Sequence, residues 1–378
     1  MKEKIRVLFV VNDLGVGGVQ RLVVDFANFI RKDCFEVNVA TLIRSPESDF
    51  LKNEVHEDVQ VTSFSFKSFW DMGEWLKFYK FMKRNKFDVV FTQLFMADTI
   101  GRSVAYLTGV PVIITEIQNI IPNLPKKFIF VDKILAYITD ACISTALAVT
   151  NYATSVIKFP PQKIVEIATN VVDERRFKIL PDKENFRKSI NIPSDAKIVI
   201  NIGRLVSQKG QSVFLKASKE IISKKDNVYF LIVGSGRLEE QLKKEARALG
   251  VDRKIKFLGA RKDTPELLIN SDVFAFPSLW EGQGLILFEA IFSKIPIVAS
   301  NTGGIPEVVE DGVTGLLVEP GNDKDLAENI LQILKDCDLG EKLANQAYDR
   351  FKGRTLENSV RGLEKVFKSL FDKKKKNR

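Results

Sequence analysis

Short runs of β-branched and aliphatic residues alternate with longer segments of helical periodicity along most of the chain. This alternation predicts repeated βαβ units and a mostly parallel sheet, because each parallel connection needs a crossover, usually a helix. In the first half, the predicted strands are residues 6–11, 36–42, 89–93, 112–116, 141–144 and 164–167. In the second half, they are residues 197–202, 229–233, 255–258, 273–276, 297–299 and 315–318. The pattern therefore predicts an α/β protein with two doubly wound parallel sheets.

Two domains also fit the length of 378 residues, which is more than one ordinary core organises. Residues 171–195 are rich in charge, contain Pro181 and Pro193, and lack a continuous apolar period, as is typical of an interdomain connection. We place the boundary near residue 185, which gives domains of residues 1–185 and 186–354. After residue 318 the chain is predicted to be helical.

The composition indicates a globular protein, since 45% of the residues are apolar and 28% are charged. The cysteines Cys34, Cys142 and Cys337 lie far apart without a C-x-x-C spacing, which favours neither a disulfide framework nor a zinc site. Arg6 interrupts the apolar run at the amino terminus, so we interpret that run as a buried strand rather than a secretory signal. We expect a cytoplasmic protein.

The formal net charge of +9 favours an anionic partner. Nucleic acid is disfavoured, because no helix-turn-helix, zinc-finger or aromatic-strand signature accompanies the charge. Two basic clusters could instead contact the anionic inner face of the cytoplasmic membrane. One is a helical flank with Lys77, Lys80, Lys83 and Arg84, and the other is the run Lys373, Lys374, Lys375 and Lys376. The alternatives are a solvated helix flank and lysines that complement a helix dipole.

A first glycine-rich element, residues 12–18 (NDLGVGG), directly follows the first predicted strand. Small residues at a helix start let backbone N–H groups approach an anion closely. The spacing is not G-x-G-x-x-G, and no acidic residue clearly follows the second strand at the place where a nicotinamide ribose would be held, which disfavours a dehydrogenase. A tight turn without a ligand remains the alternative.

A second element, residues 203–210 (GRLVSQKG), follows the strand at 197–202 and places Arg204 and Lys209 beyond its carboxyl end. Open α/β sheets bind ligands at that edge. Arg204 could grip phosphate oxygens through its planar fork, and Lys209 could add a compact charge, so that together they would neutralise a diphosphate. The alternative is two solvated loop cations.

The most informative stretch is residues 276–290 (FPSLWEGQGLILFEA), in which two carboxylates flank a glycine-bearing turn. Gly284 and Leu285 fall at the predicted helix start, where N–H groups and the helix dipole favour phosphate. Glu281 is predicted in the loop and Glu289 on the helix, and a carboxylate beside such a site can accept bonds from sugar hydroxyls. An exposed structural Glu289 is the alternative.

Together with residues 301–307 (NTGGIPE) and 312–318 (GVTGLLV), these elements resemble glycosyltransferase family 4 over nearly all of the second half. The first half resembles the family more loosely, through Gly17-Gly18 and residues 163–173. Members of the family usually have Asn-Gly-Val-Asp where this chain has Asn170-Val171-Val172-Asp173. The chain therefore departs from the family at the position of that glycine.

The resemblance implies a GT-B fold, with two Rossmann-like domains that face an interdomain cleft. It also implies a retaining, metal-independent transferase without a cofactor, whose second domain holds a nucleotide diphosphate sugar (NDP-sugar) and whose first domain binds the acceptor. The helix at about residues 355–378 would pack back on the first domain. The acceptor would be a glycan or a lipid-linked glycan, in the assembly of cell-surface polysaccharide or glycolipid.

By motif position, the resemblance also assigns roles to residues. Arg204 and Lys209 would hold the diphosphate, Glu289 the ribose hydroxyls and Glu281 the hydroxyls of the transferred sugar, so the catalytic set is Glu281, Arg204 and Lys209. The remaining donor-binding residues would be Gly18 from the opposite domain, Gly203, Gly284 and Leu285. Separately from the resemblance, we place Arg261 beside the base, because it follows the predicted strand that ends at Leu258.

Many family members carry a histidine after the fourth or fifth strand, but the only histidine of this chain is His56, in a charged loop. The corresponding stretch reads Thr115-Glu116-Ile117-Gln118-Asn119, so we assign no general base. Glu116, Gln118 or Asn119 would instead contact the acceptor or the donor sugar. Two other functions stay open: a nucleotide-sugar epimerase on the same fold, and a noncatalytic nucleotide-sugar-binding subunit of a larger transferase.

Overall fold

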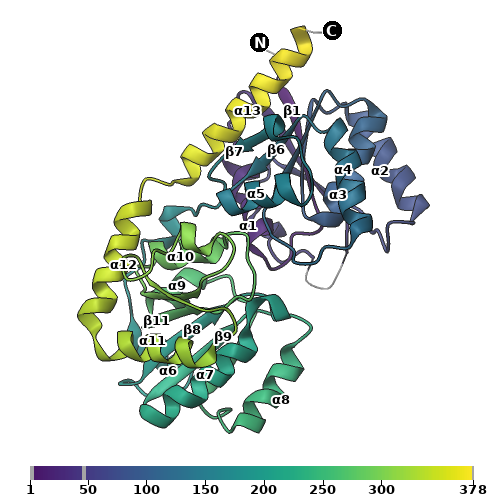
Figure 1. The fold of residues 1–378 in the computed structure, drawn as a ribbon. Coiled ribbons are helices and arrows are strands. Elements are labelled where there is room, and N and C mark those ends of the chain that lie inside the picture. The colour runs from purple at the N-terminus through teal and green to yellow at the C-terminus, as the bar shows by residue number, and fades with distance from the viewer. Residues whose placement is uncertain (1–3, 45–47, 377–378) are drawn as a thin grey trace. The chain divides into compact units, whose positions relative to one another are not determined.

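The computed structural model describes residues 4–44 and 48–376, which divide into two compact units. Unit 1 comprises the described residues up to Val171 together with those from Leu356 onward, and unit 2 comprises Val172–Thr355 (Figure 1). Each unit contains one parallel sheet flanked by helices. The two doubly wound parallel sheets predicted from the hydrophobic pattern are thus confirmed.

The sheet of unit 1 has the strand order β3-β2-β1-β4-β5-β6-β7, and all of its strand pairs are parallel. Its strands are β1 (Ile5–Val11), β2 (Phe35–Thr41), β3 (Gln60–Ser63), β4 (Val89–Gln93), β5 (Val112–Ile117), β6 (Ala141–Ser144) and β7 (Ile164–Glu166). The strand that the sequence did not predict is β3, a short edge strand with exposed ends and no fully buried residue. An edge strand of this kind carries too little apolar signal to be recognised.

The helices of unit 1 are α1 (Gly18–Phe29), α2 (Met72–Asn85), α3 (Phe95–Thr108), α4 (Lys126–Ile138), α5 (Leu147–Ser155) and α13 (Leu356–Lys376). Leu8 and Val10 of β1 pack in one cluster with Phe78 of α2 and Ile100 of α3. On the other face of β1, Phe9 contacts Phe367 of α13, with ring centroids 6.3 Å apart. Because side chains alternate along a strand, α13 covers the face opposite to α2 and α3.

Helix α13, drawn in yellow in Figure 1, is separated in sequence from the rest of unit 1 but is fixed to it by buried contacts. Glu364 is only 4% exposed, and its carboxylate accepts hydrogen bonds from the backbone N and the Nε of Arg31, both at 2.8 Å. Phe367 is fully buried. The described part of the last helix therefore belongs to the core of unit 1.

A buried ion network joins α3 to α4 inside unit 1. Arg102, which is 2% exposed, pairs with Asp98 and, at 2.7 Å, with Asp132 of α4. Asp98 also accepts hydrogen bonds from the hydroxyls of Thr92 and Thr115, both at 2.5 Å. Burial, reinforced by the nearby Asp98 charge, raises the pKa of Asp132 to about 6. The network turns the acidic groups of both helices toward the interior.

The sheet of unit 2 has the strand order β10-β9-β8-β11-β12-β13 and is also parallel throughout. Its strands are β8 (Lys197–Ile202), β9 (Val228–Val233), β10 (Ile255–Gly259), β11 (Val273–Phe276), β12 (Ile297–Ser300) and β13 (Leu316–Val318). Its helices are α6 (Lys183–Ser189), α7 (Gln211–Lys224), α8 (Glu239–Leu249), α9 (Thr264–Ile269), α10 (Leu285–Phe292), α11 (Asp323–Lys335) and α12 (Cys337–Phe351).

Unit 2 begins earlier in the chain than the boundary expected near residue 185. The segment that precedes α6 packs on unit 2: Phe177 contacts Phe292 with ring centroids 6.2 Å apart, and the backbone N of Asp182 donates to Asn270 Oδ1 at 2.8 Å. Val172 and Thr355 also form an isolated parallel bridge. These contacts come from scattered residues, which leave no periodic pattern in the sequence.

Candidate donor-binding site

The predicted donor residues of unit 2 lie at the carboxyl edge of its sheet. The chain order reverses between β8 and β11, which are neighbours in the sheet. The loops after these two strands contain residues 203–210 and 277–284. Such a switch point is where open α/β sheets bind ligands, because neighbouring loops leave it in opposite directions.

The two loops are joined by a nearly buried ion pair between Lys209 and Glu281. The Lys209 ammonium contacts the Glu281 carboxylate, and their side chains are 14% and 8% exposed. The same ammonium lies 4.9 Å from the ring centroid of Phe276, at the end of β11. A lysine held by a carboxylate and an aromatic ring keeps its charge in one place. The sequence predicted both residues for this site but not their contact.

Arg204, the other predicted diphosphate ligand, has a different environment. It is exposed, and it forms no ion pair within the described residues. Its backbone carbonyl accepts a hydrogen bond from Gln211 Nε2 at 3.1 Å, which fixes the loop at that point. Gly203, the residue before it, lies against the aliphatic part of the Lys209 side chain. The site therefore combines one nearly buried, paired cation with one exposed cation.

The loop after β11 is supported from two sides. Its Leu279 backbone N donates to the Gln208 carbonyl at 2.8 Å, and Gln208 Nε2 donates to the Trp280 carbonyl at 3.1 Å. From the loop after β12, Gly303 approaches so closely that a Cβ atom there would lie 1.8 Å from the carbonyl oxygen of Glu281. Gly303 also has φ +56°, which favours glycine. These contacts fix the backbone that carries Glu281.

Helix α10 begins at this loop, as the sequence predicted. Gly284 is its N-cap residue, with φ +87°, and Leu285 is its first residue. Gly284 supplies no side-chain cap, so the first N–H groups of the helix are available as hydrogen-bond donors to an anion. Glu289 lies on the same helix, 7% exposed, with Oε1 3.9 Å from Arg176 Nη1.

Arg261 lies at the same sheet edge but away from this group. It follows β10, which is separated from β8 by β9. Its guanidinium pairs with Asp263 at 2.8 and 2.5 Å, and this pairing holds the pKa of Asp263 below its usual value. The structure therefore does not bring Arg261 into contact with Lys209, Glu281 or Glu289.

Arg354 is a residue of this region that the sequence did not indicate. Its guanidinium lies 4.6 Å from the ring centroid of Phe288 on α10, and its Nη2 donates to Gln283 Oε1 at 3.3 Å. Burial lowers the pKa of Arg354 to about 10. Because Arg354 is 71 positions away from Gln283 in the sequence, no local pattern could reveal that it supports the loop before α10.

In unit 1, the glycine-rich element lies at the corresponding switch point, between β1 and β4. Asp13 Oδ1 accepts hydrogen bonds from Gly15 N at 2.8 Å and Gln20 Nε2 at 3.1 Å, and Gly18 is the first residue of α1. The loop is thus an ordered turn at a helix start.

Glu116 lies at the carboxyl end of β5 but faces inward. It is 4% exposed, its oxygens accept hydrogen bonds from Thr169 and Gln93, and burial raises its pKa. In this conformation its carboxylate is occupied by protein groups. Gln118 and Asn119 follow in the next loop and are half-buried, whereas His56 is exposed.

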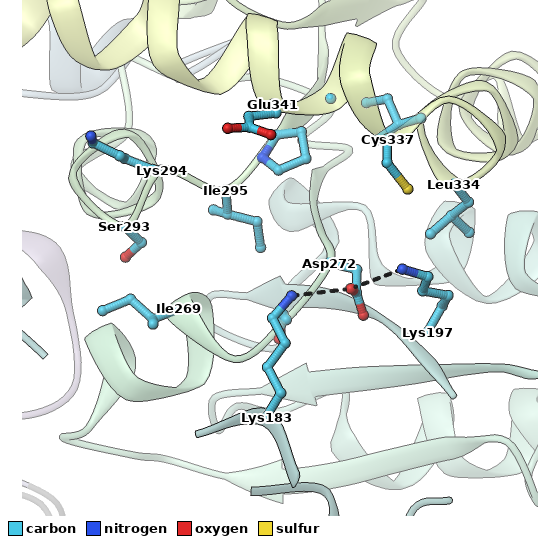
Figure 2. A pocket seen from close by; sticks show the side chains of 14 residues that line it. Lys183, Lys197, Ile269, Asp272, Ser293, Lys294, Ile295, Leu334, Cys337 and Glu341 are labelled. Atoms are coloured by element: carbon cyan, nitrogen blue, oxygen red, sulfur yellow. Dashed lines mark hydrogen bonds and ion pairs between the residues drawn. The ribbon is translucent and has the colours of Figure 1, made fainter. Parts of the chain in front are cut away.

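A hollow with a volume of about 310 Å³ lies at the opposite edge of the unit 2 sheet. Figure 2 shows Lys183 and Lys197 pointing toward Asp272, at 3.3 and 3.5 Å. Arg187 also pairs with Asp272, at 2.9 Å. Lys197 begins β8 and Asp272 directly precedes β11, so the hollow is at the amino edge. Asp272 already partners these cations, and none of the predicted donor residues lines the hollow.

Within the described residues, no group of three or more His, Cys, Asp or Glu side chains has an arrangement that could hold a metal ion. In the same part of the chain, no helix combines the length and apolar character needed to cross a membrane.

Two family models match the chain, and together they cover both units. One, described as "Glycosyltransferase Family 4", matches residues 16–175, and the other, "Glycosyl transferases group 1", matches residues 182–350. The chain belongs to glycosyltransferase family 4. It is therefore a sugar-transferring enzyme, and the family assigned from its motifs is confirmed.

Individual relatives with similar sequences are also glycosyltransferases. Over 333 residues, 85% of each chain, the sequence is 28% identical to an Escherichia coli enzyme named UDP-Gal:alpha-D-GlcNAc-diphosphoundecaprenol alpha-1,3-galactosyltransferase. It is 34% identical over 176 residues, 44% of this chain and 45% of the other, to a GDP-mannose-dependent monoacylated phosphatidylinositol monomannoside mannosyltransferase of Corynebacterium glutamicum.

The crystal structure of Anabaena HepE in complex with UDP and glucose matches 97% of this chain and 100% of its own, with a TM-score of 0.85 and 22% identity. Together with the two parallel sheets, this match shows that the family 4 chain has the GT-B fold.

Proposed function

We propose that this family 4 enzyme transfers a sugar from an NDP-sugar to a glycan or lipid-linked acceptor, with retention at the anomeric carbon and without a metal ion. The observation that carries the proposal is the Lys209–Glu281 pair, placed beside the uncapped start of α10 at the switch point of unit 2. Fixed positive charge and free N–H groups at one sheet edge suit a diphosphate.

The charge changes during transfer assign a role to each group. Breaking the bond between the anomeric carbon and the phosphate oxygen leaves growing negative charge on the nucleoside diphosphate. Lys209, Arg204 and the N–H groups of Gly284 and Leu285 would stabilise that charge as preorganised donors. These groups would supply the positive potential that a divalent ion supplies in other enzymes, so the proposed reaction requires no metal.

The two carboxylates would orient the donor. Within the described residues, no protein group donates a hydrogen bond to the Glu289 carboxylate, so its two oxygens can accept bonds from the ribose hydroxyls. Glu281 would contact the hydroxyls of the transferred sugar while it holds Lys209 in place. Because no second carboxylate is assigned as a nucleophile, we propose front-face displacement, in which the acceptor oxygen attacks on the side that the diphosphate leaves.

The names of these relatives support the substrate classes. The Escherichia coli relative is named for a UDP-sugar donor and a diphosphoundecaprenol-linked acceptor, and the Corynebacterium relative for GDP-mannose and a phosphatidylinositol mannoside. The names differ in the donor base, so we propose an NDP-sugar without assigning the base. We further propose that unit 1 carries the acceptor site, to which Gln118 and Asn119 contribute.

The proposal is tested by incubating the full chain with UDP-glucose, UDP-galactose, UDP-N-acetylglucosamine or GDP-mannose, with water as a slow acceptor. One donor should release its nucleoside diphosphate, and NMR should show the α sugar as the first product, since these donors are α-linked. A chelator should change the rate by less than about twofold. A β first product would contradict retention, loss of rate with the chelator would contradict metal independence, and no release from any donor would contradict the transfer itself.

A further inference from the structure

The outer surface of unit 1 over α2, α3 and α4 has an unusual composition. Figure 1 shows these three helices side by side, and contacts link α2 to α3 and α3 to α4. The inner sides of α2 and α3 pack on the sheet face that carries Leu8 and Val10. Ala136 of α4 packs in a separate cluster with Cys142 of β6. Cys142 is on the same face, because it pairs with Thr115, two positions after Ile113. The outward sides of the three helices therefore form one continuous surface, which we call the three-helix face.

Large apolar side chains are exposed on this face. On α4, Phe130, Ile134 and Tyr137 are 64%, 50% and 74% exposed, and their spacing places them in one stripe along the helix. The neighbouring helices add more, at 53% exposure or above: Met72 and Leu76 of α2, and Tyr106 and Leu107 of α3. Most of the exposed large apolar residues within the described chain lie in unit 1. A stripe of this kind marks a binding surface rather than ordinary exposure.

The charges on the same face are positive. Lys126, Lys127 and Lys133 of α4 are exposed beside the apolar stripe. Helix α2 contributes four exposed cations to the three-helix face: Lys77, Lys80, Lys83 and Arg84.

The acidic residues of these helices are turned away from this face. Glu74 is buried under Lys77, and Asp98 and Asp132 point inward to Arg102. Lys77 is balanced by its ion pair with Glu74 at 2.7 Å, but within α2, α3 and α4 no acidic residue is exposed to balance the other cations.

We infer that the three-helix face rests on an anionic lipid bilayer, with Phe130, Ile134 and Tyr137 entering the headgroup region. A protein-binding surface is usually depleted of lysine at its core, whereas here lysines interleave with the apolar stripe. Lysine stems can lie along apolar surface while the ammonium groups reach lipid phosphates, and tyrosine suits the same boundary. The combination of apolar stripe and unbalanced positive charge fits lipid best.

This surface differs from the one that the sequence suggested. The cations of α2 belong to it, but the lysine run at Lys373–Lys376 ends α13, whose body covers the opposite face of the sheet. Lys374 pairs with Asp140 at 2.7 Å, and this contact gives part of the run a structural role. The sequence also did not reveal the stripe on α4, because the helical pattern alone does not tell which apolar residues are buried.

The inference is tested by flotation of the full chain with vesicles of phosphatidylcholine alone or mixed with phosphatidylglycerol, without donor or acceptor. The protein should float only with the anionic vesicles. Two triple variants should each reduce the bound fraction at least about tenfold. One removes the apolar stripe (Phe130→Gln/Ile134→Gln/Tyr137→Gln), and the other removes the lysines of α4 (Lys126→Gln/Lys127→Gln/Lys133→Gln). Because no sugar transfer is measured, this outcome is independent of the proposed reaction.

Matched controls lie in unit 2, where Ile179 and Leu180 are exposed apolar residues and Lys216, Lys219 and Lys244 are exposed cations. Two control variants should keep binding within about twofold of the unaltered chain: the apolar control Ile179→Gln/Leu180→Gln and the charge control Lys216→Gln/Lys219→Gln/Lys244→Gln. Equal loss in the control and test variants would overturn the inference, and so would failure of the unaltered chain to float with anionic vesicles.

A second readout does not depend on removing the surface. Tyr137→Trp should be quenched by brominated lipid in anionic vesicles, whereas Leu180→Trp should not, after subtraction of the signal of the native tryptophans. Equal quenching at the two positions would show that the three-helix face is not the part that meets the bilayer.

Discussion

Lys209→Met is expected to lower turnover at saturating donor by about 10²- to 10³-fold, the usual effect of removing one preorganised donor to developing charge. Methionine keeps the packing against Phe276, so the change removes mainly the charge. It also leaves the Glu281 carboxylate nearly buried without its partner, which should destabilise unit 2 by about 3–5 kcal/mol. Initial rates of nucleoside diphosphate release and thermal unfolding measure the two effects.

The double variant Lys209→Met/Glu281→Gln separates catalysis from stability. Without either charge, no buried carboxylate is left unpaired, and the unfolding midpoint should return most of the way to that of the unaltered chain. Turnover should stay low, because the cation is still missing. If the double variant recovered turnover together with stability, Lys209 would have only a structural role.

Gly303→Ala should raise the dissociation constant for the nucleoside diphosphate by at least about tenfold and destabilise the chain by more than about 2 kcal/mol. The added Cβ would lie 1.8 Å from the carbonyl oxygen of Glu281, so the loop after β11 has to move. Calorimetric titration and thermal unfolding provide the measurements.

Gly312→Ala is the matched control for this variant. Gly312 has φ +69°, close to the +56° of Gly303, but a Cβ there would meet nothing within 4 Å. The control should lose only about 1 kcal/mol of stability from backbone strain and should bind the nucleotide normally. Similar effects of the two substitutions on nucleotide affinity would mean that the close approach of Gly303 to Glu281 does not support the site.

Except for the edge strand β3, the strands were predictable from the sequence, as was the start of α10, because their signals are local. Runs of buried apolar residues mark β8 and β11, and glycine followed by an apolar period marks Gly284 and Leu285 as a helix start. Loops that follow parallel strands share one sheet edge, so Arg204, Lys209 and Glu281 could be assigned to one region before their contacts were known.

The contacts within the site were not predictable, since they join loops that are distant in sequence. Lys209 and Glu281 are 72 positions apart, and Arg354 and Gln283 are 71 apart. Their meeting depends on β8 lying next to β11 and on the path of the chain after α12, neither of which local periodicity records. The inward position of Glu116 was hidden for the same reason, because Thr169 reaches it from beyond β7.

Hydrogen exchange of the full chain with and without a saturating nucleoside diphosphate tests the central claim most directly. That claim is that the carboxyl edge of unit 2 holds the diphosphate through Arg204, Lys209 and the start of α10. We predict slower amide exchange in peptides that cover residues 203–210 and 281–289, with unchanged exchange around Asp272 at the amino edge. Binding of the nucleotide that left both loops unprotected, or that protected only the amino edge, would contradict the account.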